Sequence, residues 1–438
     1  MISSVATRGS RVVLRCAALL CVPLVWTVGC GSPAPTRGQA GQSGTNGSAG
    51  VAGGGTGGQS GGSTGGTASG GHAGSSGGGG SAGSAGSSDA GSAQGGGAGQ
   101  VTAPDAGAVC SSEPAPSCAQ NGCPVPPSCA SGGSGRTDCG ANKESCCTTL
   151  EVPCGAYYRT YSNDGTGPMG QDDPAVVSNF RLDKYLVTVG RFRQFVQAWN
   201  GGSGYTPPSG SGKHTHLNGG KGLVNAAGSV DAGAPSYEPG WVTSNNSNLM
   251  LTNQNLACDP TYATWTKTAG SNEDFPINCV NWYEAYAFCI WDGGFLPSEA
   301  EFEYASAGGS QQREYPWGED DPGTSSAYAI FGCDHGADGG GCTGLVNLAP
   351  VGTTKMGAGR WGHLDLAGET SEWNLDVYAS FGDPCIDCAA FQGGSGRVNR
   401  GGSFRSSASP YLQSFFRGDL LYATDRTSSF GIRCARTP

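Results

Sequence analysis

The sequence predicts an α+β fold with an unusually large share of loop. Two segments carry the period of buried or amphipathic helices, the first of them following directly on strand-forming residues, and a third opens with a helix-start signal. Long stretches rich in glycine, serine and asparagine separate these segments, as in residues 200–250. The pattern begins at about residue 155, and the chain from there to residue 438 is long enough to bury a hydrophobic core.

Residues 1–30 predict the signal peptide of a bacterial lipoprotein. Three arginines in the first 15 residues precede an apolar run of 13 residues, "CAALLCVPLVWTV", which is short for a membrane span. The small residue before Cys30 resembles a lipobox, although Thr27 stands where leucine is usual. We therefore predict a lipid on Cys30, with ordinary signal cleavage as the alternative.

Residue Gly31, which follows the lipid-attachment cysteine, is not the aspartate associated with retention in the inner membrane. The predicted location is therefore that of an exported outer membrane lipoprotein, facing the periplasm or the cell surface. The membrane is the first predicted partner, through the lipid anchor. Nucleic acid is excluded as a partner, because the net charge is −10 and the chain has no basic run.

Residues 31–107 consist mostly of glycine, serine, alanine and threonine, as in "GGGTGGQSGGSTGGTASGG". This composition cannot bury a core, so we predict a disordered tether that holds a folded domain away from the membrane. Residues 108–154 are rich in cysteine and proline and poor in apolar residues. Such a segment needs disulfides to fold, either as a module of its own or as a cap on the domain at 155–438.

Cysteine usage supports export. The chain has 19 cysteines, of which two leave with the signal peptide and Cys30 would carry lipid. The remaining even number predicts a set of disulfides in an oxidising compartment. Zinc at "CIDC", residues 385–388, is the alternative for one pair, although no second pair stands at finger-like spacing.

The domain at 155–438 contains three predicted helices. The segment 180–199 reads as a strand that leads into a helix, and 281–294 reads as a helix that stops at two glycines. In the segment 296–306, Ser298 followed by Glu301 predicts a capping box at the start of the third helix. The buried faces predicted for the first two helices consist of Val189, Phe192, Phe195 and Val196, and of Trp282, Ala285, Tyr286 and Cys289.

Six blocks in this domain stand in the order found in a known family. They are "FRLDKYLVTVGRFRQFV", "PINCVNWYEAYAFCIWDGGFLPSEAEFEYASAGG", "YPWGEDDP", "GHLDLAGETSEWNLDVY", "RVNRGGSF" and "SSFGIRCAR". In these blocks, which cover roughly residues 178–436, the chain resembles the formylglycine-generating enzymes, also called sulfatase-modifying factors. The resemblance implies one irregular, loop-rich domain that is distantly similar to C-type lectin-like domains.

The block "DLAGETSEW" suggests a calcium site. Asp365 and Glu372 supply carboxylates, and a curled loop can aim backbone carbonyls of Gly368 and Thr370 at the same point. The resemblance implies a structural Ca²⁺ at these four positions, although Asp365 stands where the family often has asparagine. From the residues alone, an acidic loop satisfied by hydrogen bonds is the alternative.

The resemblance also implies a disulfide between Cys289 and Cys434. This bridge would close a loop of about 145 residues and contribute roughly 4–5 kcal/mol in the chain-entropy model.

The stretch "RGGSFRSSASPYLQSFFRG", residues 400–418, occupies the position of the family's active site. The oxidases of the family bind copper(I) there through two cysteines, and soft copper(I) requires thiolates. In this chain the matching positions are Ser406 and, less firmly, Tyr411, and no cysteine occurs from 389 to 433. No copper is expected, and the oxidase chemistry is predicted to be lost.

The residues predicted to form a ligand groove at this position are Ser403, Phe404, Arg405, Ser406 and Tyr411. Arg400 and Arg417 are either further ligand contacts or ordinary partners of buried carboxylates. The predicted ligand is a peptide, protein or small molecule that the sequence does not identify. The predicted function is that of a divergent or non-catalytic member of the family that binds this ligand in the former active-site groove.

A metal-dependent oxidoreductase, of the non-haem iron or formylglycine-generating type, is the alternative. Iron needs a facial triad of two histidines and a carboxylate. The pair His214 and His216 in "KHTH" is the candidate, but the spacing alone is a weak signal. Iron is therefore not favoured.

Overall fold

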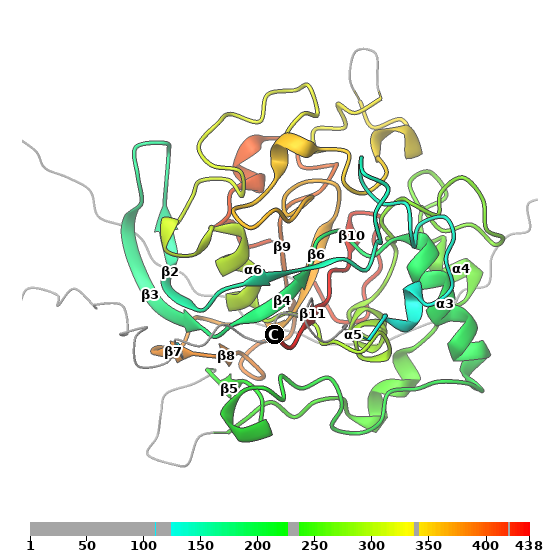
Figure 1. Cartoon of the computed structure of the whole chain (residues 1–438), viewed down its shortest axis with the longest axis horizontal. Helices are drawn as coiled ribbons and strands as arrows, with labels where there is room; N and C mark the ends of the chain where they lie inside the picture. Colours follow the sequence, from blue (N-terminus) through cyan, green and yellow to red (C-terminus); the bar gives the residue numbers. More distant parts are fainter. Residues whose placement is uncertain (1–109, 111–123, 227–235, 337–340, 419–420) are drawn as a thin grey trace, which may run out of the picture. The chain divides into compact units, whose positions relative to one another are not determined.

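The computed structural model describes residue 110 and residues 124–226, 236–336, 341–418 and 421–438 (Figure 1). The predicted signal peptide, the predicted tether and Cys30 lie outside the described residues. The helices are α3 (Val189–Trp199), α4 (Asn253–Leu256), α5 (Trp282–Trp291) and α6 (Glu299–Ser306). Among the described residues, no helix is both long enough and apolar enough to span a bilayer.

The strands are short and belong to four small sheets. They are β1 (Thr149–Val152), β2 (Gly155–Ser162), β3 (Met169–Val177), β4 (Phe180–Asp183), β5 (Val224–Asn225), β6 (Ser371–Val377), β7 (Cys385–Ile386), β8 (Cys388–Ala389), β9 (Arg397–Arg400), β10 (Phe430–Gly431) and β11 (Ala435–Arg436). The strand orders are β1-β4-β11, β10-β6-β9, β2-β3-β7 and β5-β8. The predicted α+β, loop-rich fold class is therefore confirmed.

The three predicted helices are present. Helix α3 follows β4 closely, and the side chain of Thr188 accepts a hydrogen bond from the backbone of Arg191 at its start. Both capping-box bonds predicted for Ser298 and Glu301 form at the start of α6, and Asn281 forms a second capping box that begins α5. These caps satisfy backbone N–H groups that the first turn of a helix leaves without partners.

The hydrophobic core has two large parts. One is built around α3 and α5 and contains Phe192, Phe288 and Trp373, all fully buried. The other lies between α6 and the long hairpin β2-β3 (Figure 1), and it contains Phe302 of α6 and Tyr157 of β2. Strands β6 and β10 carry residues of the first part, so the sheet β10-β6-β9 rests on a rigid base.

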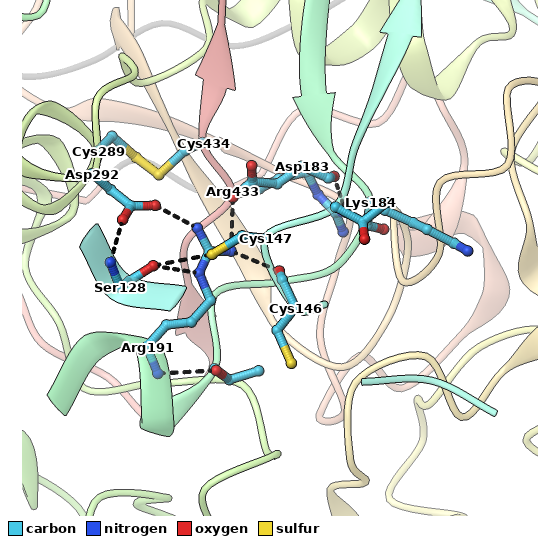
Figure 2. Close-up of polar contacts among 12 residues, drawn as sticks. Ser128, Cys146, Cys147, Asp183, Lys184, Arg191, Cys289, Asp292, Arg433 and Cys434 are labelled. Atoms are coloured by element: carbon cyan, nitrogen blue, oxygen red, sulfur yellow. Dashed lines mark hydrogen bonds and ion pairs between the residues drawn. A yellow bond between two sulfur atoms is a disulfide. The ribbon is translucent and has the colours of Figure 1, made fainter. Parts of the chain in front are cut away.

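The described part of the cysteine-rich segment contacts the core through Arg191 of α3, whose side chain is fully buried. Its guanidinium donates to the Ser128 Oγ atom at 3.1 Å and to the backbone carbonyl of Cys146 at 3.0 Å. It also pairs with Asp183 at 2.8 Å and with Asp292 at 2.7 Å. Figure 2 shows Arg191 among these groups, with Ser128 also bonded to Asp292. One side chain thus joins the segment, the end of β4 and the end of α5.

Every cysteine in the part of the chain that the structure describes belongs to a disulfide. The pairs are Cys110–Cys154, Cys129–Cys147, Cys139–Cys146, Cys258–Cys279, Cys289–Cys434, Cys333–Cys342 and Cys385–Cys388. The bridge between Cys289 and Cys434 is the pair that the resemblance implies (Figure 2). The two cysteines of "CIDC", for which zinc was the alternative, are bonded to each other.

Candidate functional site

The loop that begins with Gly401 and Gly402 leaves the end of β9 in a tight turn. Both glycines have positive φ angles, and a Cβ atom on Gly402 would lie 2.6 Å from the backbone oxygen of Tyr411. Only glycine permits this conformation at so close an approach. The turn brings Ser406 back beside its start, where the Ser403 backbone N–H donates to the Ser406 Oγ atom at 3.0 Å.

A groove of about 430 Å³ opens beside this turn. Four of the five residues predicted for a ligand groove line it: Ser403, Arg405, Ser406 and Tyr411. Phe404 does not line the groove, and its predicted place there is corrected. Its ring is fully buried and packs against Tyr262 at a centroid distance of 5.4 Å, so it supports the turn from the core.

The other wall of the groove comes from the sheet β10-β6-β9. Ser371 begins β6, Asn399 lies on β9 and Phe430 begins β10, and all three line the groove. Sequence reasoning missed these residues. Two of the quoted blocks, "DLAGETSEW" and "SSFGIRCAR", contain Ser371 and Phe430, but strands this short give no period by which to assign them to a common wall.

Arg400 and Arg417 lie outside the groove lining and pair with carboxylates of α6. Arg400 is buried and contacts Glu299 at 2.7 Å and Glu303 at 2.9 Å. Arg417 contacts Glu299 at 2.7 Å. Of the two readings that the sequence left open for these arginines, the structure shows ordinary pairing. Burial nevertheless raises the pKa of Glu303 to about 8, although Arg400 opposes this shift.

The four residues of the predicted calcium site lie in a curled loop before and within β6. Asp365 and Gly368 both have positive φ angles. The Asp365 carboxylate accepts hydrogen bonds from the Gly352 backbone at 2.6 Å and the Thr354 hydroxyl at 3.1 Å. The carboxylate of Glu372 accepts from the Arg433 guanidinium at 2.9–3.1 Å. The protein itself thus supplies partners to both carboxylates.

The charge of this loop is not balanced by Arg433. Asp365, Glu369 and Glu372 are all buried, and burial raises the pKa of each, that of Glu372 to about 7. The hydroxyl of Thr370 is buried with no hydrogen-bond partner within the described ranges. Each carboxylate oxygen can accept a further bond. The donor set therefore fits a hard cation in charge and oxygen chemistry, although no group of three acidic, histidine or cysteine side chains converges among the described residues.

Of the two histidines that were the candidates for iron, His214 is engaged by carboxylates instead. Both ring nitrogens of the fully buried His214 are engaged, by Glu238 and Glu301, each at 3.0 Å. Burial alone would lower the pKa of His214, but the two carboxylates outweigh it and raise the pKa to about 10. His216 lies beside it with a ring-centroid distance of 6.2 Å, and burial lowers its pKa to about 4. As placed, His214 has no nitrogen left for a metal.

A family model described as a sulfatase-modifying factor enzyme 1-like domain matches residues 136–438. The formylglycine-generating enzyme of Streptomyces coelicolor is 29% identical over 299 residues, which cover 64% of this chain and 84% of that protein. The hercynine oxygenase of Mycobacterium tuberculosis is 32% identical over 173 residues, which are 34% of this chain and only 36% of that protein.

A bovine relative named inactive C-alpha-formylglycine-generating enzyme 2 is 31% identical over 125 residues, covering 26% of this chain and 40% of that protein. Among solved structures, PvdO from Pseudomonas aeruginosa is similar with a TM-score of 0.42 and 20% identity, over 66% of this chain and 94% of that one.

Proposed function

The chain belongs to the sulfatase-modifying factor enzyme 1-like family, and we propose that it is an exported, non-catalytic member that binds a ligand in its groove. One observation carries the proposal. The resemblance matches Ser406 and, less firmly, Tyr411 to the copper thiolates of the oxidases. Both residues line the groove, and every described cysteine is in a disulfide elsewhere. A serine hydroxyl does not replace a thiolate for copper(I).

Three further observations support this proposal. The dense disulfides are consistent with export, and the N-terminal sequence supports a lipid on Cys30 and a place in the outer membrane. The chain is similar to a protein whose printed name calls it inactive. We propose that this chain lost the oxidase activity of the family and kept the former active-site groove as a ligand-binding site. In this proposal, residues 31–107 separate the binding domain from the membrane.

We also propose a structural Ca²⁺ at Asp365, Gly368, Thr370 and Glu372. Its support is the excess of buried carboxylates in this loop and the buried hydroxyl of Thr370. The ion would neutralise charge in a loop whose C-terminal part, β6, forms one wall of the groove.

The competing function is a metal-dependent oxidoreductase, which the names of the relatives favour. The two are separated by purifying the full chain, measuring its iron and copper content, and recording oxygen consumption with a cysteine-containing peptide. We expect no stoichiometric redox metal and no consumption above background. The enzyme from Streptomyces coelicolor serves as the positive control. Stoichiometric iron or copper together with oxygen consumption would show that the chain is an oxidoreductase.

A further inference from the structure

We propose that the groove takes an organic anion, with an acidic group held at Arg405 and an apolar body against the aromatic wall. This inference rests on the proposed binding function and names the chemistry of the ligand. Three independent features of the groove lead to it: its charge, the orientation of its hydroxyl groups, and the apolar side chains beside them.

The first feature is charge. Among the described lining residues, Arg405 is the one that carries a formal charge, and none is acidic. Its side chain is exposed and stacks over the Tyr262 ring at 4.4 Å. It forms no ion pair within the described ranges, whereas Arg400 and Arg417 are paired with glutamates. In a chain of net charge −10, an arginine with no ion pair and no acidic neighbour among the described lining residues favours an anionic ligand.

The second feature is the direction of the hydroxyl groups. The Ser406 Oγ atom accepts from the Ser403 backbone at 3.0 Å, and the Ser403 Oγ atom accepts from the Arg405 backbone at 3.3 Å. The Thr427 Oγ1 atom accepts from the Ser429 backbone, also at 3.3 Å. A hydroxyl that accepts from the backbone keeps its own proton to donate. These three groups thus add donors, which an acidic group with several oxygens would satisfy.

The third feature is the apolar part of the groove. Tyr411, Phe416, Leu421 and Phe430 line it, and the rings of Tyr411 and Phe416 meet edge to face at 5.2 Å. Tyr411 is 42% exposed, which is unusual for a large aromatic side chain of this domain. The groove, at about 430 Å³, has the size of a small-molecule site and is too large for an inorganic ion alone. The ligand should therefore carry an apolar or aromatic body next to its acidic group.

The test uses the full chain and four probes that share a phenyl ring: phenyl phosphate, phenyl sulfate, phenylacetate and the neutral 2-phenylethanol. Binding is measured by calorimetry and by ligand-detected NMR. We expect at least one anion to bind, and the neutral probe to bind about tenfold more weakly or not at all. Comparison among the three anions shows which acidic group the groove prefers.

Arg405→Gln should weaken binding of the preferred anion about tenfold. Arg360→Gln is the matched control, because Arg360 is also exposed and also stacks on a neighbouring aromatic ring, at 5.3 Å from Trp361, but lies outside the groove lining. Thr427→Val should give a smaller loss, because it removes one donor and leaves the charge in place.

Equal binding of 2-phenylethanol and the anions, unchanged in Arg405→Gln, would overturn the anion inference and leave a binding groove. Binding of none of the probes would also overturn the inference. Neither result bears on whether the chain is an oxidase, which the metal and oxygen measurements decide separately.

Discussion

The carboxyl group of Glu303 is buried, and its contacts do not fully offset the cost of desolvating its charged form. Its Oε2 atom accepts from Arg400 at 2.9 Å, while its Oε1 atom is buried with no partner in the described part of the chain. Burial raises its pKa from the ordinary 4.5 to about 8. Between about pH 4.5 and pH 8, the folded protein therefore holds a proton on Glu303 that the unfolded chain has already released.

A raised carboxyl pKa stabilises the fold below the unfolded value and loses that contribution as pH rises through the folded value. The free energy of unfolding should therefore fall by about 1–3 kcal/mol between pH 5 and pH 8.5 through this group. Glu303→Gln should show a smaller fall, measured by urea denaturation at several pH values. Glu319→Gln, at an exposed position, should match the parent. An identical pH dependence in parent and Glu303→Gln would show that Glu303 is ionised in the folded state.

At this scale, sequence reasoning located most of the groove but not the direction of each side chain. Ser403, Arg405, Ser406 and Tyr411 were predicted because the resemblance places them at the family's active site, and they line the groove. Phe404 points into the core instead. The backbone of this turn bends at two glycines with positive φ angles, so its side chains do not alternate regularly between the groove and the core. The sequence pattern therefore could not show which residues face the groove.

At the scale of elements, Arg191 connects α3 with the cysteine-rich segment, β4 and α5. Replacing it by methionine would leave Asp183 with a single longer ion pair, to Arg436 at 3.5 Å, and would release the carbonyl of Cys146. Removing one partner of a buried ion pair typically costs about 3–5 kcal/mol. We expect Arg191→Met to lower the free energy of unfolding by this order and to make residues 124–154 more sensitive to proteolysis.

Gln197→Met, at an exposed position of the same helix, is the control for helix propensity and hydrophobicity. It should change the free energy of unfolding by less than about 0.5 kcal/mol. A change that small in Arg191→Met would mean that other contacts, such as the pairing of β1 with β4, hold the cysteine-rich segment to the core.

The helices were predictable and most of the strands were not. Helices α3, α5 and α6 run for two or three turns, long enough to show a buried face and a capping residue. Strands β5, β7, β8, β10 and β11 have two residues each. Two residues cannot display an alternation, and their pairing is set by distant segments, as when β10 pairs in parallel with β6. The sequence pattern therefore could not predict the sheet β10-β6-β9, which forms one wall of the groove.

At the scale of the molecule, the order of six sequence blocks identified the fold where single patterns could not. The even number of cysteines predicted disulfides, but only one pairing followed from the resemblance, because cysteine spacing does not determine connectivity. That bridge joins α5 to the C-terminal strands across 145 residues. The ion-pair partner of Glu372 is likewise distant in sequence, because Arg433 stands 61 residues beyond it.

The proposed Ca²⁺ makes a prediction about the stability of the whole domain. Asp365, Glu369 and Glu372 are all buried, but within the described ranges only Glu372 forms an ion pair, with Arg433, so a divalent cation would supply further positive charge to this loop. A ligand that binds only the folded state at about 100 times its Kd adds about 2.7 kcal/mol. Chelation with EGTA should therefore lower the Tm by several degrees, and added Ca²⁺ but not Mg²⁺ should restore it, because Mg²⁺ requires a tighter octahedral site.

Glu372→Ala, which removes the oxygen donor as well as the charge, should lower the Tm and abolish its dependence on calcium, whereas Glu319→Ala should retain both. Asp365→Asn separates the effect of the oxygen donor from that of the charge, since asparagine keeps an oxygen donor at the position while removing one negative charge. We expect it to preserve calcium dependence with weaker affinity. If EGTA leaves the Tm of the parent unchanged and the purified chain contains no calcium, the buried carboxylates are instead accommodated by Arg433 and by protonation, which their raised pKa values would permit.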